Sequence, residues 1–283
     1  MTPRRTVTLT AIAMLCFAAN SLLCLGALAG GRIDAASFTL VRFLSGAVVL
    51  GLIARTRHRP APAERLAWGS AIALFVYAIG FSLAYLRIPA GTGALILFAA
   101  IQFTMIGGGI WSGERPRLAE WIGLAMSLTG LLVLTLRGQS RPDPVGALLM
   151  LAAGIGSGIY SFRGRRFADA VVGNAAIFVR TIPMAIVVSG IAWARNALHA
   201  EPSGIALALV SGVATTGVGY AIWYMALRGL TATRAAIVQL IVPVIAAVGG
   251  VAILGEHFTP RLLIAGVLIV GGIALATARR RPT

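Results

Sequence analysis

Residues 101–114, IQFTMIGGGIWSGE, and residues 243–256, PVIAAVGGVAILGE, carry one pattern twice, 142 positions apart. In both, a Gly-Gly pair is followed six residues later by Gly-Glu, which places Glu114 opposite Glu256. The same shift aligns residues 82–136 with residues 224–278. Chance matches between apolar helices give paired alanines, but two glycine motifs at one spacing indicate an internal repeat. The chain is therefore expected to contain two copies of one unit.

The composition is that of a membrane protein. Of 283 residues, 58% are hydrophobic and only 11% are charged, with a mean hydropathy of +0.90. Soluble domains carry about 25% charged residues, so a soluble enzyme or a nucleic-acid-binding domain is excluded. A helix needs about 20 apolar residues to cross a bilayer. Ten such segments are predicted, at residues 7–29, 36–54, 66–86, 91–112, 118–136, 144–162, 171–194, 203–227, 232–254 and 260–278.

The repeat divides these ten segments into two halves, predicted as residues 1–138 and 139–283. A shift of 138 also places Val41-Arg42 over Val179-Arg180, so the second segment matches the seventh. Since each half has five spans, an odd number, the second half enters the membrane from the opposite side. The predicted fold class is an all-α polytopic membrane protein with ten transmembrane helices in a 5+5 inverted repeat. Such repeats are common in secondary transporters that work by alternating access.

The charge distribution predicts the orientation. All 24 basic residues are arginine, and an amino terminus in the cytoplasm places sixteen of them in cytoplasmic segments and six in the opposite loops. The positive-inside rule then predicts that both termini are cytoplasmic. Arg4 and Arg5 before an apolar run imitate a signal peptide, but the run is about 23 residues long, and we expect it to be retained. The basic excess thus predicts contact with anionic lipids and no nucleic-acid partner.

The second half resembles a known family. Residues 220–227 (YAIWYMAL), Pro243-Val244, Leu254-Gly255-Glu256 and the glycines from Gly266 to Gly272 resemble the second repeat of the EamA-type transporters, in the drug/metabolite transporter superfamily. The first half matches less closely, because Ile101 replaces Pro243 and Phe17-Ala18-Ala19-Asn20 lacks the tryptophan often found in that segment. The resemblance implies ten helices and export of amino acids or other small metabolites. The YddG-like exporters of aromatic and other neutral amino acids are the most similar branch, and they imply a bacterial inner membrane.

Polar and aromatic residues inside the spans are the candidates for a central substrate site. A buried arginine costs at least about 2.5 kcal/mol, so the two intramembrane arginines are expected to face the bundle interior. They either bind a carboxylate or, the interpretation we favour, hold their half together through backbone carbonyls or a helix end, or share a gating role. The aromatic residues either pack or clasp a ligand, and the amides either fix ligand atoms or join helices. The candidates are Asn20, Arg42, Tyr77, Phe81, Gln102, Tyr160, Arg180, Tyr220, Trp223 and Gln239.

No catalytic, metal or cofactor site is predicted. Cys16 and Cys24 are eight residues apart, without a neighbouring histidine or acid, and are expected to pack. No acidic residue is expected at the membrane centre, and Glu114 and Glu256 at span ends suit helix capping and dipole interactions. The sequence therefore predicts that the protein is not an enzyme. It also disfavours coupling to protons or sodium through a buried carboxylate.

These patterns predict an exporter of small neutral metabolites, with amino acids as the leading class. The expected partners are a small-molecule substrate and the lipid bilayer. The oligomeric state stays open, although a monomer is compatible with the sequence. Two alternatives remain: a nucleotide-sugar or drug transporter on the same fold, and a membrane scaffold or lipid-modifying enzyme subunit that transports nothing.

Overall fold

The computed structural model describes residues 2–28, 30–57, 63–135, 143–254 and 259–278, with the side chains at 250 and 252–254 excepted. In this part of the chain, ten helical segments are long and apolar enough to cross a membrane. Eight of them are single helices: α1 (Pro3–Leu28), α2 (Ala35–Arg55), α3 (Glu64–Ala84), α4 (Ala90–Trp111), α5 (Leu118–Thr135), α6 (Pro144–Gly164), α7 (Ala170–Ala194) and α12 (Pro260–Thr277). The predicted spans agree with these helices to within a few residues.

The eighth and ninth spans are interrupted. The eighth consists of α8 (Pro202–Val210), a π-helical segment η1 (Ser211–Val218) and α9 (Gly219–Leu227). The ninth consists of α10 (Ala232–Gln239) and α11 (Val242–Leu254). Pro243 lies just after the break and lacks the N–H that would bond the carbonyl of Gln239. In α4, where the repeat has Ile101 in place of Pro243, the helix is continuous. The exchange of Ile101 for Pro243 between the repeats thus coincides with a continuous helix in the first half and an interrupted one in the second.

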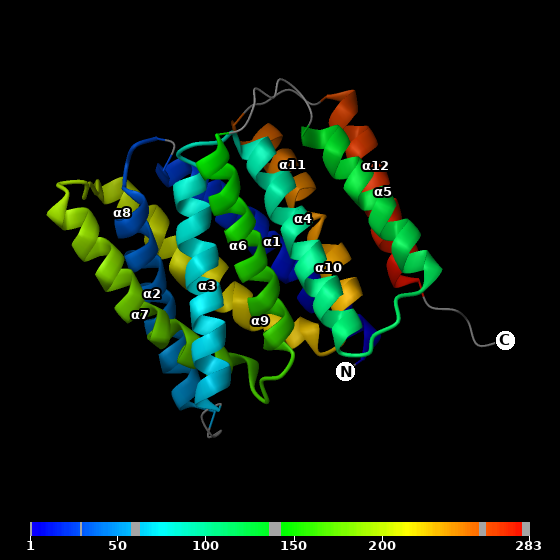
Figure 1. The fold of residues 1–283 in the computed structure, drawn as a ribbon, viewed down its shortest axis with the longest axis horizontal. Helices are drawn as coiled ribbons and strands as arrows, with labels where there is room; N and C mark the ends of the chain where they lie inside the picture. The colour runs from blue at the N-terminus through cyan, green and yellow to red at the C-terminus, as the bar shows by residue number, and fades with distance from the viewer. Residues whose placement is uncertain (1, 29, 58–62, 136–142, 255–258, 279–283) are drawn as a thin grey trace.

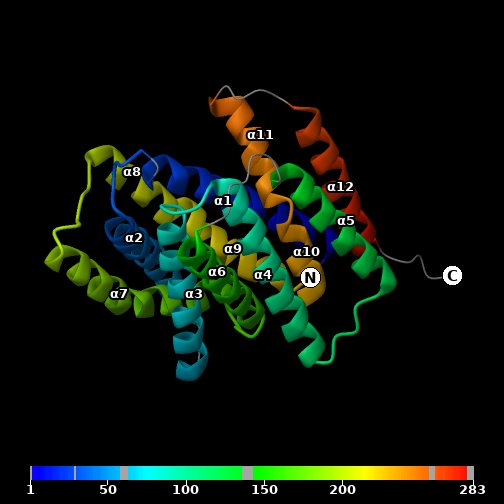
Figure 2. The ribbon, with the colours of Figure 1, turned by 45° about the horizontal axis from the view of Figure 1, so that its top comes forward.

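The two halves are packed together along most of their length. Helices α2 and α7 pack against each other, as do α1 and α9, α3 and α6, and α4 and α10. Helices α5 and α12 lie side by side at one edge of the bundle (Figures 1 and 2). Their glycines permit this approach, because a methyl group at Gly123 would lie 2.4 Å from the carbonyl oxygen of Gly272. Small residues therefore set the helix spacing, as is usual in membranes.

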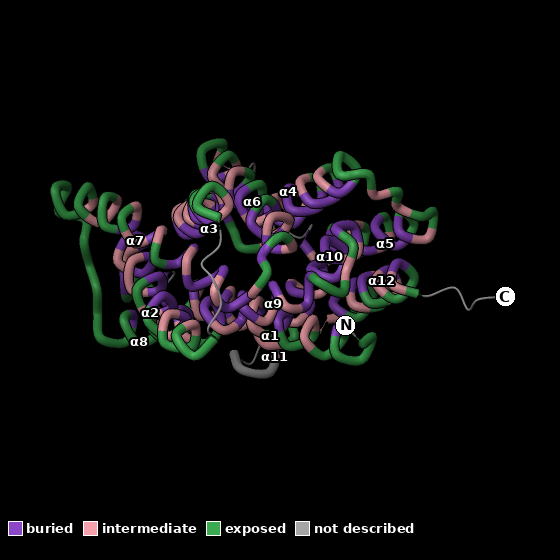
Figure 3. Tube along the Cα trace, turned by 90° about the horizontal axis from the view of Figure 1, so that it is seen from below, coloured by how far each residue is buried: buried purple, intermediate pink, exposed green. Residues whose placement is uncertain are grey.

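The outer surface of the bundle is apolar. Large side chains such as Phe103, Trp111 and Trp193 are exposed there, while the buried residues gather between the helices (Figure 3). A contiguous apolar exterior is unfavourable in water and suits contact with lipid. Helix α1 begins and α12 ends at the same end of the bundle (Figure 1), which we call the amino-terminal face. The protein is a multi-pass membrane protein.

Candidate functional site

A small cavity lies between the two halves in the middle of the bundle. Its volume is about 30 Å³, enough for a water molecule or two and too small for a metabolite. The first half contributes Phe17, Ser21, Tyr77, Phe81, Leu97, Phe98 and Ile101, and the second contributes Ser157, Tyr160, Ser161, Tyr220, Gln239 and Val242. Because both halves form its wall, relative motion of the halves would change its size.

Five of the ten predicted site residues line this cavity: Tyr77, Phe81, Tyr160, Tyr220 and Gln239. The sequence interpretation missed Phe17, the small hydroxyl residues and the aliphatic residues of the wall. The internal repeat is a signal for part of this set. It pairs Ile101 with Pro243, and Pro243 is adjacent in sequence to the lining residue Val242. Serines and leucines in an apolar helix carry no comparable signal.

Aromatic side chains continue from the cavity toward the amino-terminal face. The ring of Tyr160 lies 5.3 Å from that of Tyr220 and 4.8 Å from that of Tyr224. Tyr224 in turn stacks on Phe167 at 5.6 Å, in the loop between α6 and α7. The Tyr224 hydroxyl donates to the backbone oxygen of Tyr160 at 3.0 Å, which fixes the two rings together. These rings close the cavity on that side.

Trp223 does not line the cavity but contacts two residues that do. It is fully buried and donates from Nε1 to the Oγ of Ser161, a lining residue, at 3.1 Å. Its ring meets that of Phe17 edge-on, 5.7 Å away. Trp223 therefore orients two residues of the wall.

Arg42 on α2 is buried without a polar partner. Its exposure is 0%, and none of its three guanidinium nitrogens has a hydrogen-bond partner among the described residues. The guanidinium carbon lies 5.3 Å from the ring centroid of Phe38 and 5.5 Å from that of Phe43. It is also within electrostatic range of the cavity residues Tyr77 and Tyr220. Cation–π contacts offset only part of the cost of burying this charge.

Arg180, its repeat counterpart on α7, has a different environment. The side chain is 22% exposed and lies 3.5 Å from the carboxylate of Glu64, at the start of α3. Its Nη1 donates to the Ala176 carbonyl at 3.0 Å, and its guanidinium carbon is 5.7 Å from the ring of Trp68. The structure therefore does not bring the two arginines to one site. Arg180 has the backbone bond that the structural interpretation predicts, and Arg42 has none.

Two of the three predicted amides join helices, and the third lies at the cavity. Asn20 accepts hydrogen bonds at Oδ1 from Ser211, Thr215 and Thr216 of the π-helical segment, at 2.8–3.3 Å. Gln102 donates to the Ala236 carbonyl across the halves at 2.8 Å. Both amides hold helices together. Gln239 reaches the cavity wall while donating to the Ala235 carbonyl at 3.1 Å.

Glu114 joins the two halves at the amino-terminal face. Its carboxylate lies 2.6 Å from Nη1 of Arg165 and accepts the backbone N–H of Ala232, at 2.9 and 3.0 Å, at the start of α10. Burial raises the pKa of Glu114, but the bonds from Ala232 and Arg165 outweigh it and hold the pKa below its ordinary 4.5. Glu114 is a capping residue as predicted, although the helix belongs to the other half. Its counterpart Glu256 lies outside the described residues.

Within the described ranges, no group of three or more His, Cys, Asp or Glu side chains is placed to hold a metal ion. The fold and the cavity define a membrane protein whose two inverted halves enclose a small site lined by aromatic, aliphatic and small polar residues.

The model of the EamA-like transporter family matches residues 4–136 and again residues 144–278. The chain therefore belongs to the EamA-like transporter family and is a membrane transporter. The resemblance inferred from the sequence is confirmed, and so is the ten-helix fold. The two matches fall within the predicted halves, 1–138 and 139–283.

Individual relatives extend this finding. An uncharacterized protein of Pseudomonas aeruginosa is 46% identical over 280 residues, covering 99% of this chain and 97% of its own. A probable terminal-alkyne amino-acid exporter of Streptantibioticus cattleyicolor is 24% identical, covering 82% and 79%. A probable amino-acid metabolite efflux pump of Escherichia coli is 27% identical, covering 74% of each chain. A crystal structure with a TM-score of 0.78 and 22% identity covers 98% of this chain and 97% of its own, and it supports the fold.

Proposed function

We propose that this protein exports small neutral amino acids and related metabolites across a bacterial inner membrane. The observation that carries the proposal is Arg42, a buried guanidinium without a polar partner among the described residues. It does not line the cavity in this conformation, but it is within electrostatic range of two residues that do, Tyr77 and Tyr220. A carboxylate entering from the cavity would supply the hydrogen bonds that the protein does not. The printed names of two distant relatives, an amino-acid exporter and an amino-acid metabolite efflux pump, support the same substrate class.

The rest of the site suits an amino acid with an apolar side chain. Phe17, Phe81 and Phe98 offer aromatic surface to such a side chain, while Tyr77 and Tyr220 offer hydroxyls to its polar end. The present volume of about 30 Å³ is too small for an amino acid. Binding therefore requires the halves to separate, and the interrupted ninth span and the π-helical segment are the backbone features suited to that motion.

We place the amino-terminal face in the cytoplasm, on the strength of the sixteen arginines assigned to that side. The described acids lie in loops or at helix ends: Asp34, Glu64, Glu114, Glu120, Asp143, Asp169 and Glu201. In the described residues, none is at the level of the central cavity, where a coupling proton or sodium ion would bind. Export would then follow the concentration gradient of the amino acid itself.

The test is transport by the purified protein in liposomes preloaded with unlabelled amino acid. Labelled phenylalanine, methionine and threonine should accumulate by exchange, relative to liposomes without protein. Phenylalanine should compete, whereas phenylalaninamide, which lacks the carboxylate, should compete at least about tenfold less well. If a broad amino-acid panel gives no exchange, or if the amide competes equally well, the proposal is wrong. Strong uphill accumulation driven by an imposed proton gradient would contradict the uncoupled mechanism alone.

A further inference from the structure

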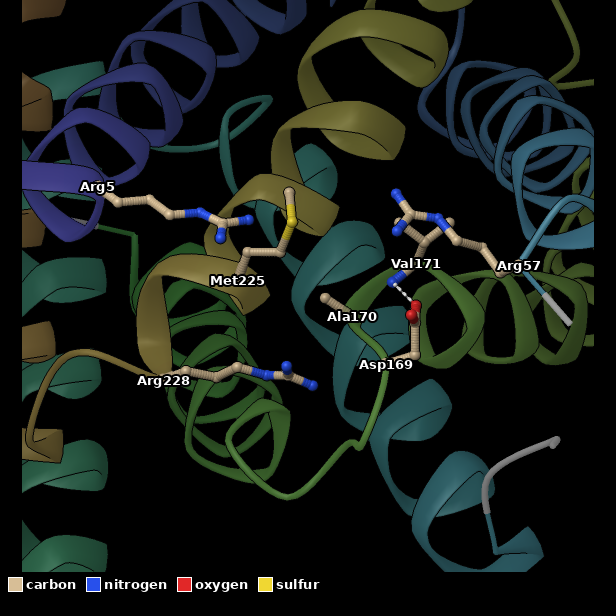
Figure 4. A pocket seen from close by; sticks show the side chains of 7 residues that line it. All are labelled: Arg5, Arg57, Asp169, Ala170, Val171, Met225 and Arg228. Atoms are coloured by element: carbon tan, nitrogen blue, oxygen red, sulfur yellow. Dashed lines mark hydrogen bonds between the residues drawn. The ribbon is translucent and has the colours of Figure 1, made fainter. Parts of the chain in front are cut away.

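A second, charged pocket opens at the amino-terminal face. Its volume is about 360 Å³, and its lining includes Arg5, Arg57, Arg228 and Asp169. Figure 4 shows the three guanidinium groups extending toward a common space beside the Asp169 carboxylate. Arg5 and Arg57 belong to the first half, and Asp169 and Arg228 belong to the second. An occupant would touch both halves.

The charges of this pocket are only partly used by the protein. In the described part of the chain, the side chains of Arg5 and Arg57 have no ion pair or hydrogen bond, and Arg228 donates to the backbone oxygens of Phe167 and Ala168. Three cations face one carboxylate, so the pocket attracts an oxyanion. The positive-inside rule explains why arginines lie on this face, but it does not explain why three from different elements converge on one hollow.

Among the described residues, Asp169 leaves one carboxylate oxygen free, unlike Asp34, which caps the second helix of the first half. Its Oδ1 caps α7, accepting from the backbone of Val171 and Val172 at 2.8 and 3.0 Å. Asp34 caps α2 in the same manner, but its other oxygen accepts the N–H of His199 at 2.9 Å. Among the described residues, Oδ2 of Asp169 has no such partner, and it is available to a cation in the pocket.

The pocket and the central cavity are both lined by residues of α9 or its C-terminal cap. Tyr220 lines the cavity and Arg228 lines the pocket, eight residues apart, or about 12 Å along the helix. Tyr224 lies between them, and its ring packs against Tyr160 and Phe167. A solute in the pocket is thus separated from the central cavity by this aromatic contact.

We propose that this pocket is a cytoplasmic loading site for the zwitterionic end of an amino acid. The carboxylate binds the guanidinium groups of Arg5, Arg57 and Arg228, and the ammonium binds Oδ2 of Asp169. The side chain of the solute lies over Met225. This inference rests on the proposed function and adds a first binding step before the aromatic contact opens.

The test compares transport through the two faces. Labelled phenylalanine enters inside-out membrane vesicles through the cytoplasmic face and right-side-out vesicles through the opposite face. Arg57→Gln and Arg5→Gln should each raise the half-saturating concentration in inside-out vesicles about threefold to tenfold, with the maximal rate unchanged. In right-side-out vesicles the same variants should leave the half-saturating concentration unchanged and lower the maximal rate by the same factor, because an uncoupled carrier must have the same ratio of maximal rate to half-saturating concentration at its two faces. Asp169→Asn keeps the helix cap and removes the charge, and it should act in the same direction.

The matched controls are Arg55→Gln and Arg4→Gln, which remove a neighbouring exposed arginine that does not line the pocket. If these controls raise the half-saturating concentration as much as the pocket variants do, or if the pocket variants change nothing, the loading site is wrong. The proposed function is unaffected by that result, provided that the wild-type protein transports amino acids. A wild-type protein that transports no amino acid overturns the proposed function instead, and the loading site with it. If Arg57→Gln acts only in liposomes that contain phosphatidylglycerol, the pocket holds a lipid phosphate, and the loading site is likewise wrong.

Discussion

Arg42 and Arg180 occupy matching positions in the two repeats, yet their surroundings differ. Arg42 is fully buried and has no polar partner among the described residues, whereas Arg180 is partly exposed and has a carboxylate, a backbone carbonyl and an indole ring around it. A cation that only holds helices together is expected to have polar partners, and Arg180 has them at both terminal nitrogens, although its Nε is buried without a hydrogen-bond partner among the described residues. An inverted repeat can therefore duplicate a position without duplicating the environment of its side chain.

The largest expected effect is that of Arg42→Gln. A hydrogen bond to a charged group is worth about 1.5–3 kcal/mol, so losing the carboxylate contact should reduce amino-acid transport roughly tenfold to a hundredfold. Abundance and thermal stability should hold or rise, because the substitution removes an unpaired buried charge. The measurement is transport per unit of protein in the membrane.

Arg180→Gln is the matched variant for that experiment. It should leave transport within about twofold of wild type, because Arg180 already has a carboxylate and a backbone carbonyl as partners, whereas Arg42 has neither among the described residues. If Arg42→Gln lowers abundance in proportion to transport, Arg42 is a structural residue like Arg180, and the contrast between them disappears.

The second prediction concerns a variant that supplies Arg42 with a carboxylate from the protein itself. Cys24 is fully buried and within electrostatic range of Arg42, so Cys24→Asp would place a carboxylate near the guanidinium. Transport should fall about tenfold while the protein remains folded, because the internal acid competes with the substrate carboxylate. Cys24→Asn is the control of equal size and should transport at several times the rate of Cys24→Asp. Equal rates for the two variants would mean that size, not charge, is responsible.

Much of the fold was accessible from the sequence, and the site was accessible only in part. Apolar runs and the glycine motifs gave the ten spans, because span length and close helix approach depend on local composition. The environments of Arg42 and Arg180 were not accessible. They depend on which residue of another helix lies opposite, such as Glu64 beside Arg180, and hydropathy carries no record of that pairing. The same holds for Glu114, whose helix partner is 118 positions away in the chain.

Arg165 is an arginine with a close ionic partner, Glu114, at 2.6 Å. The variant Glu114→Gln, which removes the charge of that partner, should have a smaller effect than the Arg42 and Cys24 variants. Since the pKa of Glu114 is lowered, its ionised contacts stabilise the fold fully above pH 4.5 and are lost as the pH falls through the folded-state pKa. Glu114→Gln should cost about 1 kcal/mol at pH 7, and the deficit should shrink only below pH 4.5. Thermal unfolding of the purified protein between pH 3 and pH 8 measures this. A deficit that changes between pH 6 and pH 8 would show that another group is responsible.

The smallest expected effect is that of Glu64→Gln. The Glu64 side chain is 84% exposed, and exposed ion pairs contribute about 0–1 kcal/mol. Arg180 would keep its bond to the Ala176 carbonyl and its contact with Trp68, so both thermal stability and transport should stay close to wild type. Thermal unfolding and transport assays of this variant check the structural half of the comparison. A large loss of transport at wild-type abundance would mean that Arg180 requires its ion pair with Glu64 for transport. Both arginines would then serve transport, Arg42 through the substrate and Arg180 through Glu64.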